Sequence, residues 1–391
     1  MSPQLKLLGD VVEFMRGITF KPEDVIDPGK SGAVVCMRTK NVQELLDVSD
    51  LIAVPPEFVR REELFLQEND VLISSANSWN LVGKVAQVPA LPYKATAGGF
   101  IAIVRARQGE IDPKFLYRWL ASGCSQAAIR ACGRQTTNIS NLSVPQFLAL
   151  PIAVPNPVEQ QRIATILDNA DSLRRKRQEA IRLADDFLRA VFIDMFGDPV
   201  TNPKGWQVKR LDALGSLDRG VSKHRPRNDP SLLGGSHPLI QTGEVANCDG
   251  YIRTYTSTYS DNGLLQSKLW PAGTLCITIA ANIAKTGILL FPACFPDSVV
   301  GFNAPEAATI EYVRFWLSFL QKSLEANAPE SAQKNINLAI LRDLRVPAPP
   351  TDLIRKFAAI VLATESIRVA QRRSIQEGQA LSESLQYVLL A

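Results

Sequence analysis

The chain has 391 residues, of which 46% are hydrophobic and 21% are charged, and its formal net charge is +4. This composition excludes disordered and fibrous proteins, and the length predicts two to three domains at roughly 100 to 200 residues each. No run of about 18 apolar residues occurs, and the N-terminus has no basic segment followed by an apolar stretch. We therefore expect a cytoplasmic protein without a membrane span.

An internal repeat runs through the chain in order. The segment KLLGDVVEFMRG from Lys6 aligns without a gap with KRLDALGSLDRG from Lys209, which pairs Gly17 with Gly220 at an offset of 203. Further matches keep this order while the offset falls in small steps, as insertions in a duplicated unit would produce. These matches are Leu72 with Leu275 (203), Trp119 with Trp316 (197), Asn138 with Asn335 (197) and Ala164 with Ala358 (194).

Each copy begins with a β-rich module and ends in a long helix. Short runs of Val, Ile, Thr and aromatic residues, broken by Gly, Pro, Asn and Asp, predict strands, and a short helix and a Pro-rich segment follow them. The predicted fold class is α+β, with two similar β-rich domains separated by two long antiparallel helices that form a coiled-coil spacer. The predicted boundaries are 1–155 for the first module, 156–197 for the central helix, 198–348 for the second module and 349–391 for the C-terminal helix.

The two long helices carry apolar or small residues at alternating spacings of three and four, interrupted once by Arg177, which is typical of a heptad seam. A helix of about 38 residues would span on the order of 57 Å, so a pair of them could hold two modules apart. The alternative is that each helix packs only on its own module. The predicted seam positions are Ile163, Ile166, Ala170, Leu173, Arg177, Ala180, Ala184, Phe187, Val191 and Met195, and then Leu353, Phe357, Ile360, Thr364, Ile367, Ala370, Ser374, Gly378, Leu381, Leu385 and Val388.

Signatures of catalysis and of metal binding are missing from the sequence. It contains no P-loop, no GxGxxG after a strand, no HExxH and no GxSxG. The only histidines are His224 and His237, and the six scattered cysteines form no CxxC pair, so we expect reduced thiols and neither a disulfide nor a zinc framework. These absences favour a binding protein over an enzyme.

The repeated segments resemble the DNA-specificity subunit of Type I restriction-modification systems. The resemblance rests on LPIAVPNPVEQQRIATILDNAD and LRVPAPPTDLIRKFAAIVLATE, joined through MFGDPVTNPKGWQVKRLDALG, and on HPLIQTGEVANCDGYIRTYTSTYSDNGL followed by LWPAGTLCIT. It covers essentially the whole chain. The second copy departs from the family's usual helix start, since it carries TDLIRKFA where the first carries VEQQRIA.

The resemblance implies a non-catalytic subunit with two target recognition domains. Each domain would read one half-site of a bipartite double-stranded DNA sequence, and the helices would set the unread gap. Two DNA adenine methyltransferase subunits would dock on the helices, and restriction subunits would cleave unmodified DNA. The chain itself would hold no cofactor, because S-adenosylmethionine and ATP are expected on the partner subunits only.

Two other functions are compatible with parts of the sequence. The chain could be a DNA-binding scaffold of another defence system with the same architecture, in which case its neighbouring genes would not encode an adenine methyltransferase and a helicase-type nuclease. A chain that itself methylates or cuts DNA is disfavoured by the missing motifs, and S-adenosylmethionine binding by the isolated chain would revive that alternative.

Candidate DNA contacts in the second module are cationic and hydrogen-bonding residues in predicted loops. The segment DRGVSKHRPRND could instead be a solvated basic loop, and the alternating GYIRTYTSTYS could be a half-buried strand. The candidates are Arg219, Lys223, His224, Arg225, Arg227, Tyr251, Arg253, Gln333 and Lys334.

Candidate contacts in the first module occupy three polar segments. Asn138 and its counterpart Asn335 could be helix or turn caps instead of contacts. The run of basic residues from Arg174 to Arg177 is balanced by acidic neighbours, which favours a solvated or partner-binding face over a DNA contact. The candidates are Arg16, Lys21, Asn77, Trp79, Asn80, Lys84, Arg130, Arg134, Gln135 and Thr136.

Overall fold

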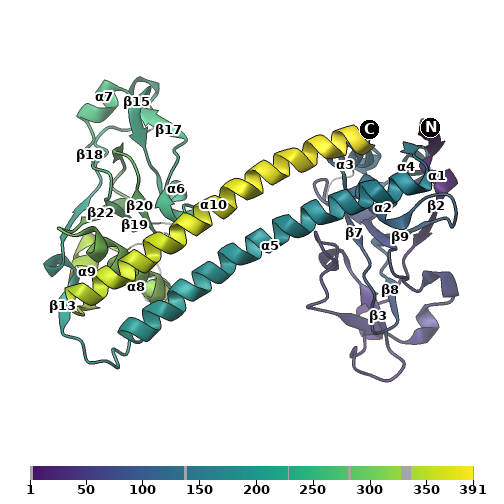
Figure 1. The fold of residues 1–391 in the computed structure, drawn as a ribbon, viewed down its shortest axis with the longest axis horizontal. Coiled ribbons are helices and arrows are strands. Elements are labelled where there is room, and N and C mark those ends of the chain that lie inside the picture. The colour runs from purple at the N-terminus through teal and green to yellow at the C-terminus, as the bar shows by residue number, and fades with distance from the viewer. Residues whose placement is uncertain (1–2, 136–138, 228, 281–282, 327–335, 391) are drawn as a thin grey trace. The chain divides into compact units, whose positions relative to one another are not determined.

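The computed structural model describes residues 3–135, 139–227, 229–280, 283–326 and 336–390 (Figure 1). Two compact units emerge from the contacts within the chain. Unit 1 comprises Met1–Gln178 and Arg372–Ala391, and unit 2 comprises Glu179–Gln371. This division runs through both long helices, whereas the boundaries expected from the sequence keep each helix apart from the modules.

Unit 1 contains four small sheets in its described part. Their strand orders are β2-β9-β5-β7, β4-β3-β8, β10-β11-β6 and β1-β12. The strands are β1 (Gln4–Leu7), β2 (Val12–Arg16), β3 (Val34–Met37), β4 (Ile52–Val54), β5 (Val71–Ser74), β6 (Ala76–Asn77), β7 (Val85–Gln87), β8 (Ala95–Ala97), β9 (Ile101–Ala106), β10 (Gly133–Gln135), β11 (Ser140–Leu142) and β12 (Pro151–Val154). The helices are α1 (Leu8–Val11), α2 (Pro113–Ala121), α3 (Gly123–Ala131) and α4 (Val144–Leu148), with one-turn helices η1 (Pro22–Asp24), η2 (Thr39–Asn41), η3 (Pro56–Phe58) and η4 (Glu62–Leu64).

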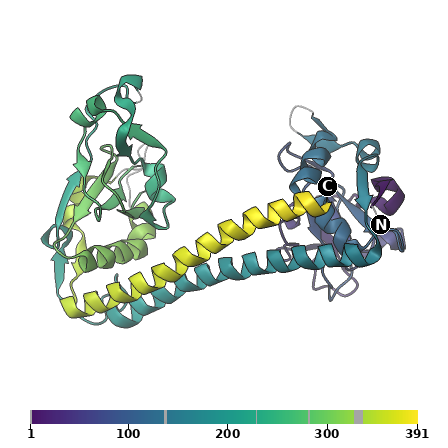
Figure 2. The same cartoon turned by 45° about the horizontal axis from the view of Figure 1, so that its top comes forward.

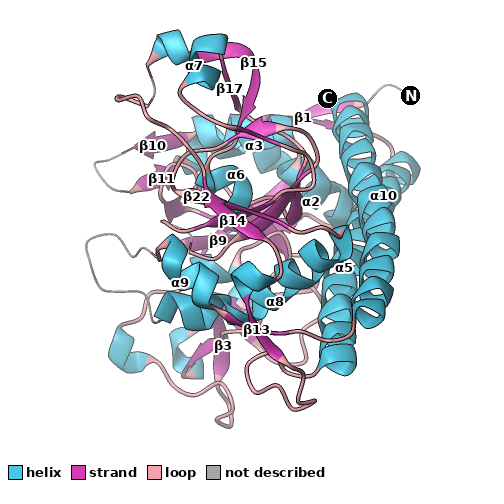
Figure 3. Cartoon of the chain, turned by 90° about the vertical axis from the view of Figure 1, so that its left-hand side faces the viewer, coloured by secondary structure: helices cyan, strands magenta, loops and turns pink. Residues whose placement is uncertain are grey.

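Unit 2 contains three sheets in its described part, with the orders β14-β22-β19-β20-β16, β17-β15-β21-β18 and β13-β23. The strands are β13 (Val208–Arg210), β14 (Ser216–Arg219), β15 (Leu233–Leu239), β16 (Gly250–Ile252), β17 (Ser257–Tyr259), β18 (Leu269–Trp270), β19 (Leu275–Thr278), β20 (Thr286–Leu289), β21 (Ala293–Cys294), β22 (Val299–Asn303) and β23 (Arg345–Pro347). The helices are α6 (Thr242–Ala246), α7 (Asp261–Leu265), α8 (Ala307–Ala326) and α9 (Leu338–Asp343), with one-turn helices η5 (Leu211–Ala213) and η6 (Pro230–Leu232); Figure 3 shows helices beside the strands of each unit.

The two units share one pattern of strand pairing, as the internal repeat predicts. Strand β9 lies between β2 and β5, and β22 lies between β14 and β19, with every pair antiparallel. In the second sheet β3 pairs antiparallel with β4 and parallel with β8, while β15 pairs antiparallel with β17 and parallel with β21. A mixed pairing repeated at equivalent places indicates a duplicated fold.

The structure corrects one match of the repeat by a single residue. Ala102 and Val300 are equivalent, because they pair with Arg16 and Arg219, which the repeat matches. Ile73 pairs with Ala102 and Ile277 pairs with Val300, so the offset in this strand is 204 (277 − 73). Leu72 is therefore equivalent to Cys276, not to Leu275. The correction matters because a one-residue slip moves a strand residue to the opposite face of its sheet.

The hydrophobic cores follow these faces. In unit 1, Val71 and Ile73 face a core formed with α2, while Leu72 faces a second core formed with β3 and β8. In unit 2, Leu275 and Ile277 face a core formed with α8, while Cys276 packs with residues such as Trp270. Each main sheet is therefore buried on both faces.

Gly17 and Gly220 mark the same close approach in the two units. A Cβ atom on Gly17 would lie 2.3 Å from the carbonyl oxygen of Gly98, and one on Gly220 would lie 2.3 Å from that of Phe295. No side chain fits at these distances, which explains why the repeat keeps glycine at both positions. The backbone N–H groups of Gly17 and Gly220 donate to Ile101 and Val299, respectively.

Two helices of 40 residues each, α5 (Pro157–Phe196) and α10 (Thr351–Leu390), follow the modules. The Asn156 side chain accepts a hydrogen bond from Glu159 N at 3.0 Å and caps α5, and Gly197 follows its end with a φ of +80°. Within each unit α5 and α10 lie side by side (Figures 1 and 2). They are antiparallel, because unit 1 holds the N-terminal part of α5 with the C-terminal part of α10, and unit 2 holds the opposite halves.

The expected heptad seam is correct at some positions and wrong at others. Ile163 and Phe357 are buried, but five expected seam residues are strongly exposed, whereas Leu188, Phe192 and Phe196 on α5 are buried in the core of unit 2. Both helices therefore pack on the modules as well as on each other. These five are Leu173, Phe187, Ile367, Leu381 and Val388, and the small seam residues Ala180 and Ala370 are exposed as well.

Two further features of the described residues are the lengths of their helices and the state of their cysteines. No helix among them is long and apolar enough to cross a bilayer. All six cysteines are free thiols, of which only Cys124 is exposed. Burial raises the pKa of Cys36 to about 12, which makes it unreactive as a nucleophile near neutral pH.

Candidate DNA-binding surface

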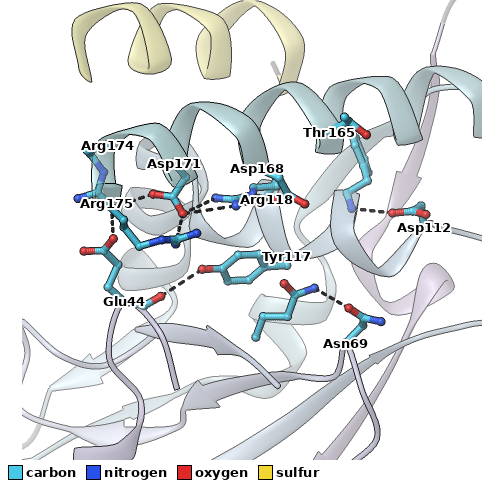
Figure 4. Close-up of polar contacts among 12 residues, drawn as sticks. Glu44, Asn69, Asp112, Tyr117, Arg118, Thr165, Asp168, Asp171, Arg174 and Arg175 are labelled. Carbon is cyan, nitrogen blue, oxygen red and sulfur yellow. Dashed lines mark hydrogen bonds and ion pairs between the residues drawn. The ribbon is translucent and has the colours of Figure 1, made fainter. Parts of the chain in front are cut away.

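A network of arginines and carboxylates holds the module of unit 1 on α5 (Figure 4). Arg118 of α2 donates from Nε to Asp168 at 2.7 Å and lies 3.4 Å from Asp171. Arg174 and Arg175 also donate to Asp171, at 2.7 and 2.5 Å. Arg174 extends further to the carboxylate of Glu44 in the module, and Figure 4 shows these side chains converging between the two elements.

The polar network also perturbs the pKa values of its members. Burial and the neighbouring Arg175 lower the pKa of Arg174, and burial raises the pKa of Tyr117, whose hydroxyl donates to the backbone oxygen of Glu44 at 3.4 Å. Arg177 donates to the backbone oxygen of Ser374 at 3.0 Å. Three of the four basic residues from Arg174 to Arg177 thus bind groups within unit 1, which favours a structural role over DNA contact.

Unit 2 repeats the central pair of this network with other partners. At the helix offset of 194, Asp171 corresponds to Glu365 and Arg174 corresponds to Arg368. The Arg368 side chain is 6% exposed and donates to Glu365 at 2.8 Å and to Asp185 of α5 at 3.0 Å. Glu365 in turn binds Arg253 of the module. In both units an acid–arginine pair three residues apart on the helix therefore anchors the β-rich module.

The structure brings two of the three polar segments of unit 1 together. Asn77 of β6 pairs with Ser140 of β11, and Arg134 of β10 pairs with Asn141 of the same strand. The ring of Trp79 comes within 3.4 Å of the position that a Cβ atom on Gly133 would take. Segments 76–80 and 133–135, which are far apart in the sequence, thus form one polar surface.

The side chains of this surface differ in exposure. Trp79 is 39% exposed, and Asn80 and Arg134 are also exposed. Asn77 is half-buried and donates to Ser74 at 3.1 Å, while Lys84 donates to Gln43 at 2.5 Å. Trp79, Asn80 and Arg134 are consequently the most available to a ligand.

The other candidates of unit 1 lie outside this sheet. Arg16 is exposed at the end of β2, and Lys21 is exposed at the start of η1 with its ammonium 3.7 Å from Glu23. Arg130 is half-buried in the last turn of α3. Among the remaining candidates, Gln135 is described only by its backbone, and Thr136 and Asn138 lie outside the described residues.

Phe100 is a surface residue that the sequence analysis missed. It is 62% exposed, and its backbone oxygen accepts hydrogen bonds from Ser75 N at 2.9 Å and Ala76 N at 3.2 Å. Its neighbour Ile101 accepts the hydrogen bond from Gly17 N. Phe100 thus links the segment after Arg16 to the polar surface of unit 1. The signal in the sequence was a large apolar residue directly after two glycines.

In unit 2 three arginines of the basic loop converge on Asp297. Arg219 donates from Nε to the backbone oxygen of Asp297 at 3.0 Å, Arg227 binds its carboxylate, and Arg225 lies 3.6 Å from the carboxylate. Arg225 also donates to the backbone oxygen of Ser222 at 2.6 Å. These exposed arginines therefore gather around one carboxylate.

Two further candidates of the loop, Lys223 and His224, are exposed. The His224 ring lies 3.3 Å from Asp229 while its backbone N–H donates to Gln266 at 3.0 Å. Gln333, Lys334 and Asn335 lie outside the described residues.

Two candidates of unit 2 are corrected by their surroundings. Tyr251 is 6% exposed, its hydroxyl donates to Glu311 at 2.5 Å, and burial raises the pKa of its phenol. Arg253 donates to the backbone oxygen of Tyr251 at 3.1 Å and binds Glu365 of α10. Tyr251 lies in β16 and Arg253 directly follows this strand. Because both side chains bind carboxylates of unit 2, we remove both residues from the candidate DNA contacts.

No group of three or more His, Cys, Asp or Glu side chains in the described part of the chain is arranged to hold a metal ion. The candidate surfaces consist instead of arginines, amides and exposed aromatic rings on a duplicated scaffold. Such groups suit phosphate and base-edge contacts, which defines the class as a two-module DNA-binding protein.

Comparison with known proteins identifies the family. Residues 4–183 and 203–361 each match the model of the Type I restriction modification DNA specificity domain. The chain is 23% identical over 413 aligned positions to the Type I restriction enzyme EcoKI specificity subunit of Escherichia coli (strain K12), covering 96% of this chain and 85% of that protein.

Solved structures have the same fold. The S subunit of a Type I restriction-modification system from M. genitalium superposes with a TM-score of 0.64 at 15% identity, covering 100% of this chain and 99% of that one. A chain from a structural study of complex assembly and conformational transition in the type I R-M system gives a TM-score of 0.56 at 16% identity, with coverages of 99% and 97%.

The chain therefore belongs to the Type I restriction modification DNA specificity family and contains two copies of its domain. It is a specificity subunit of a Type I restriction-modification system, the subunit of such a complex that is not itself catalytic.

Proposed function

We propose that each unit binds one half-site of a bipartite double-stranded DNA sequence and that the chain directs adenine methyltransferase and restriction subunits to it. The observation that carries this proposal is the pairing of a repeated scaffold with unlike surface residues. Gly99 and Phe100 of unit 1 correspond, at the offset of 198 in these strands, to Asp297 and Ser298 of unit 2. Two readers on one scaffold can thus recognise different bases.

The candidate contacts that support this proposal are Trp79, Asn80, Phe100 and Arg134 in unit 1. In unit 2 they are Arg219, Lys223, Arg225 and Arg227. Arginines recognise phosphates and guanine edges, and asparagine suits adenine, while an apolar ring can contact a thymine methyl group. Since phosphate contacts fix orientation and base contacts specify sequence, both kinds of group are needed at each half-site.

Repeated exposed residues on the long helices support docking of two similar partner subunits. At the helix offset of 194, Leu173 corresponds to Ile367, Phe187 to Leu381 and Ile193 to Tyr387, and all six are exposed. Unit 1 holds one member of each pair and unit 2 holds the other. Large apolar side chains that remain exposed at equivalent positions mark protein interaction sites. We propose that one methyltransferase subunit docks at the three exposed residues of each unit. These are Leu173, Leu381 and Tyr387 in unit 1, and Phe187, Ile193 and Ile367 in unit 2.

The catalytic chemistry of the complex would belong to the partners. In this proposal the methyltransferase subunits bind S-adenosylmethionine and methylate adenine, and the restriction subunits use ATP and cleave unmodified DNA. The chain contributes recognition, and α5 and α10 determine the length of unread DNA between the half-sites.

Single-molecule sequencing of modified adenines in the host genome, with and without this gene, tests the proposal. We expect N6-methyladenine in a two-part motif with a fixed gap, and its loss on deletion of the gene. Complementation with a Trp79→Ala/Asn80→Ala chain should relax only one half of the motif, and an Arg225→Ala/Arg227→Ala chain only the other. If methylation survives deletion while the partner genes are expressed, the chain is not the reader and a scaffold role replaces this proposal.

A further inference from the structure

A cavity of about 450 Å3 lies beside the arginine cluster of unit 2. Its lining includes the charged residues Arg219, Arg227 and Asp297, the polar residues Ser298 and Asn337, and apolar residues such as Ile336. Its polar lining is therefore dominated by two guanidinium groups and one carboxylate, and a third guanidinium, that of Arg225, lies 3.6 Å from that carboxylate.

The charges of this cluster do not balance. Three arginines meet one carboxylate, and the side chains of Arg225, Arg227 and Asp297 are 55%, 46% and 35% exposed, so all remain accessible to a ligand. The forked geometry of a guanidinium suits carboxylate and phosphate oxygens alike. In the free protein the Asp297 carboxylate therefore binds guanidinium groups that could instead bind a phosphate.

Unit 1 has no carboxylate at the equivalent place. Arg16 corresponds to Arg219 by the offset of 203, but Asp297 corresponds to Gly99. A Cβ atom on Gly99 would lie 3.4 Å from the nearest atom, the backbone oxygen of Ile18, and its φ does not lie in the left-handed region, so a side chain is tolerated there. The carboxylate is therefore a feature of unit 2 that can be transplanted into unit 1.

We propose that this cavity binds one backbone phosphate of the DNA half-site read by unit 2, and that Asp297 determines specificity as the internal counter-ion that positions its arginines. This inference rests on the proposed reading of DNA by unit 2. The carboxylate holds Arg225 and Arg227 in place before DNA arrives and repels a phosphate that enters. The base contacts of the correct half-site fix a phosphate where the arginines can leave Asp297 and bind it, whereas an incorrect half-site leaves the arginines bound to Asp297. Asp297 therefore suppresses binding to incorrect sequences.

Fluorescence anisotropy of the full chain, assembled with its methyltransferase partner, tests this inference. The probes are two duplexes, one with the motif found by genomic sequencing and one with the half-site of unit 2 scrambled, each titrated over a series of salt concentrations. Asp297→Asn should raise affinity for the scrambled duplex about fivefold, because Arg225 and Arg227 are no longer held by a carboxylate and become free to bind its phosphates. Affinity for the correct duplex should change less, so discrimination falls.

A matched control removes the same charge elsewhere in unit 2. Asp218 precedes Arg219 in the chain and is 57% exposed, and its carboxylate lies 3.9 Å from Lys268 and 3.6 Å from Arg342, which are both outside the cluster. Asp218→Asn should leave discrimination unchanged. Equal effects of the two substitutions, or an equal loss of affinity for both duplexes in Asp297→Asn, would overturn the role of Asp297.

Arginine variants separate this inference from the proposal on which it rests. Arg227→Ala should reduce the slope of log affinity against log salt by about one on the correct duplex, since one phosphate contact is lost. If the slope falls but Asp297→Asn matches its control, unit 2 binds DNA and only the inference about Asp297 is wrong. If neither Arg227→Ala nor Arg225→Ala changes binding, unit 2 does not bind DNA through this loop.

The reciprocal substitution provides an independent test in unit 1. Gly99→Asp places a carboxylate near Arg16, and we expect weaker binding to a duplex whose unit 1 half-site is scrambled, with improved discrimination. Gly99→Asn is its uncharged control. If the two variants behave alike, the effect arises from the added volume and not from charge.

Discussion

Unit 1 and unit 2 are two versions of one scaffold, and they differ most where a ligand would bind. Both keep glycine at the close approach of Gly17 and Gly220, and both anchor the module through an acid and an arginine three residues apart on the helix. At the surface, however, unit 1 presents Phe100, whereas unit 2 presents Asp297 with three arginines. The difference teaches that packing constrains the scaffold tightly and leaves the recognition surface free to diverge.

The largest effect on stability is expected from changing the glycine that both units keep at their close approach. Gly220→Ala would place a Cβ atom 2.3 Å from the carbonyl oxygens of Phe295 and Pro296, and should destabilise unit 2 by about 3 kcal/mol. Thermal unfolding with hydrogen exchange resolved by peptide should show the loss in unit 2. Gly243→Ala is the control, because no atom lies within 4 Å of a Cβ atom at this helical position. An equally small effect of both changes would contradict the shared steric constraint.

The second prediction compares the stability that the acid–arginine pair on the helix contributes in each unit. Glu365→Gln weakens the binding of two arginines at once, Arg253 and the 6% exposed Arg368, although Arg368 keeps Asp185, and it should cost about 2–4 kcal/mol of stability. Asp171→Asn should cost less, because Arg118 keeps Asp168 and Arg174 keeps Glu44. Urea denaturation compares the two variants. Glu377→Gln, which removes a 63% exposed carboxylate from α10, should cost less than about 1 kcal/mol. A larger loss in Asp171→Asn than in Glu365→Gln would reverse the comparison.

The third prediction concerns partner docking at exposed apolar residues that occupy equivalent positions on α5 and α10. Phe187→Asp and Leu381→Asp should each weaken docking of one methyltransferase subunit by about 2 kcal/mol, since large apolar side chains often dominate interfaces. Native mass spectrometry should show complexes with one methyltransferase subunit in place of two, and the double variant should bind neither. Both residues are exposed, so folding should be retained. Val200→Asp, at a 65% exposed site beyond α5, is the control. Unchanged stoichiometry in the double variant would exclude these positions as docking sites.

The sequence predicted the repeat, the two long helices and the family, because duplication leaves matching glycines, prolines and apolar periods. It misplaced the strand register at Leu72, since spacing alone cannot tell which face of a sheet a residue occupies when both faces are buried. It also overextended the heptad seam to Phe187 and Leu381. A residue such as Phe192 packs on a module that is distant in the sequence, and no local period encodes that contact.

The candidate site was predictable in composition but not in arrangement. The arginines of the basic loop were evident as a cluster, yet Asp297 lies about 70 residues from Arg227 along the chain, and only strand pairing brings it near. Tyr251 and Arg253 seemed suitable for DNA because of their residue types. Their actual partners, Glu311 and Glu365, come from two helices much later in the chain. Tertiary contacts therefore decide which polar residues remain available.

The smallest expected effect tests whether the divergent surface alone determines recognition. Phe100→Ser gives unit 1 the residue that unit 2 carries at the equivalent position, Ser298. Because Phe100 is 62% exposed and contributes mainly its backbone to the local hydrogen bonds, stability should change by less than about 0.5 kcal/mol. DNA affinity should fall only about threefold, but sequencing of modified adenines should show a relaxed base preference confined to the half-site of unit 1. Leu5→Ser, at a 73% exposed position on β1, serves as the control for loss of an exposed apolar residue. Relaxation in the half-site of unit 2 would contradict independent reading by the two units, because a surface residue on one scaffold would then govern recognition by the other.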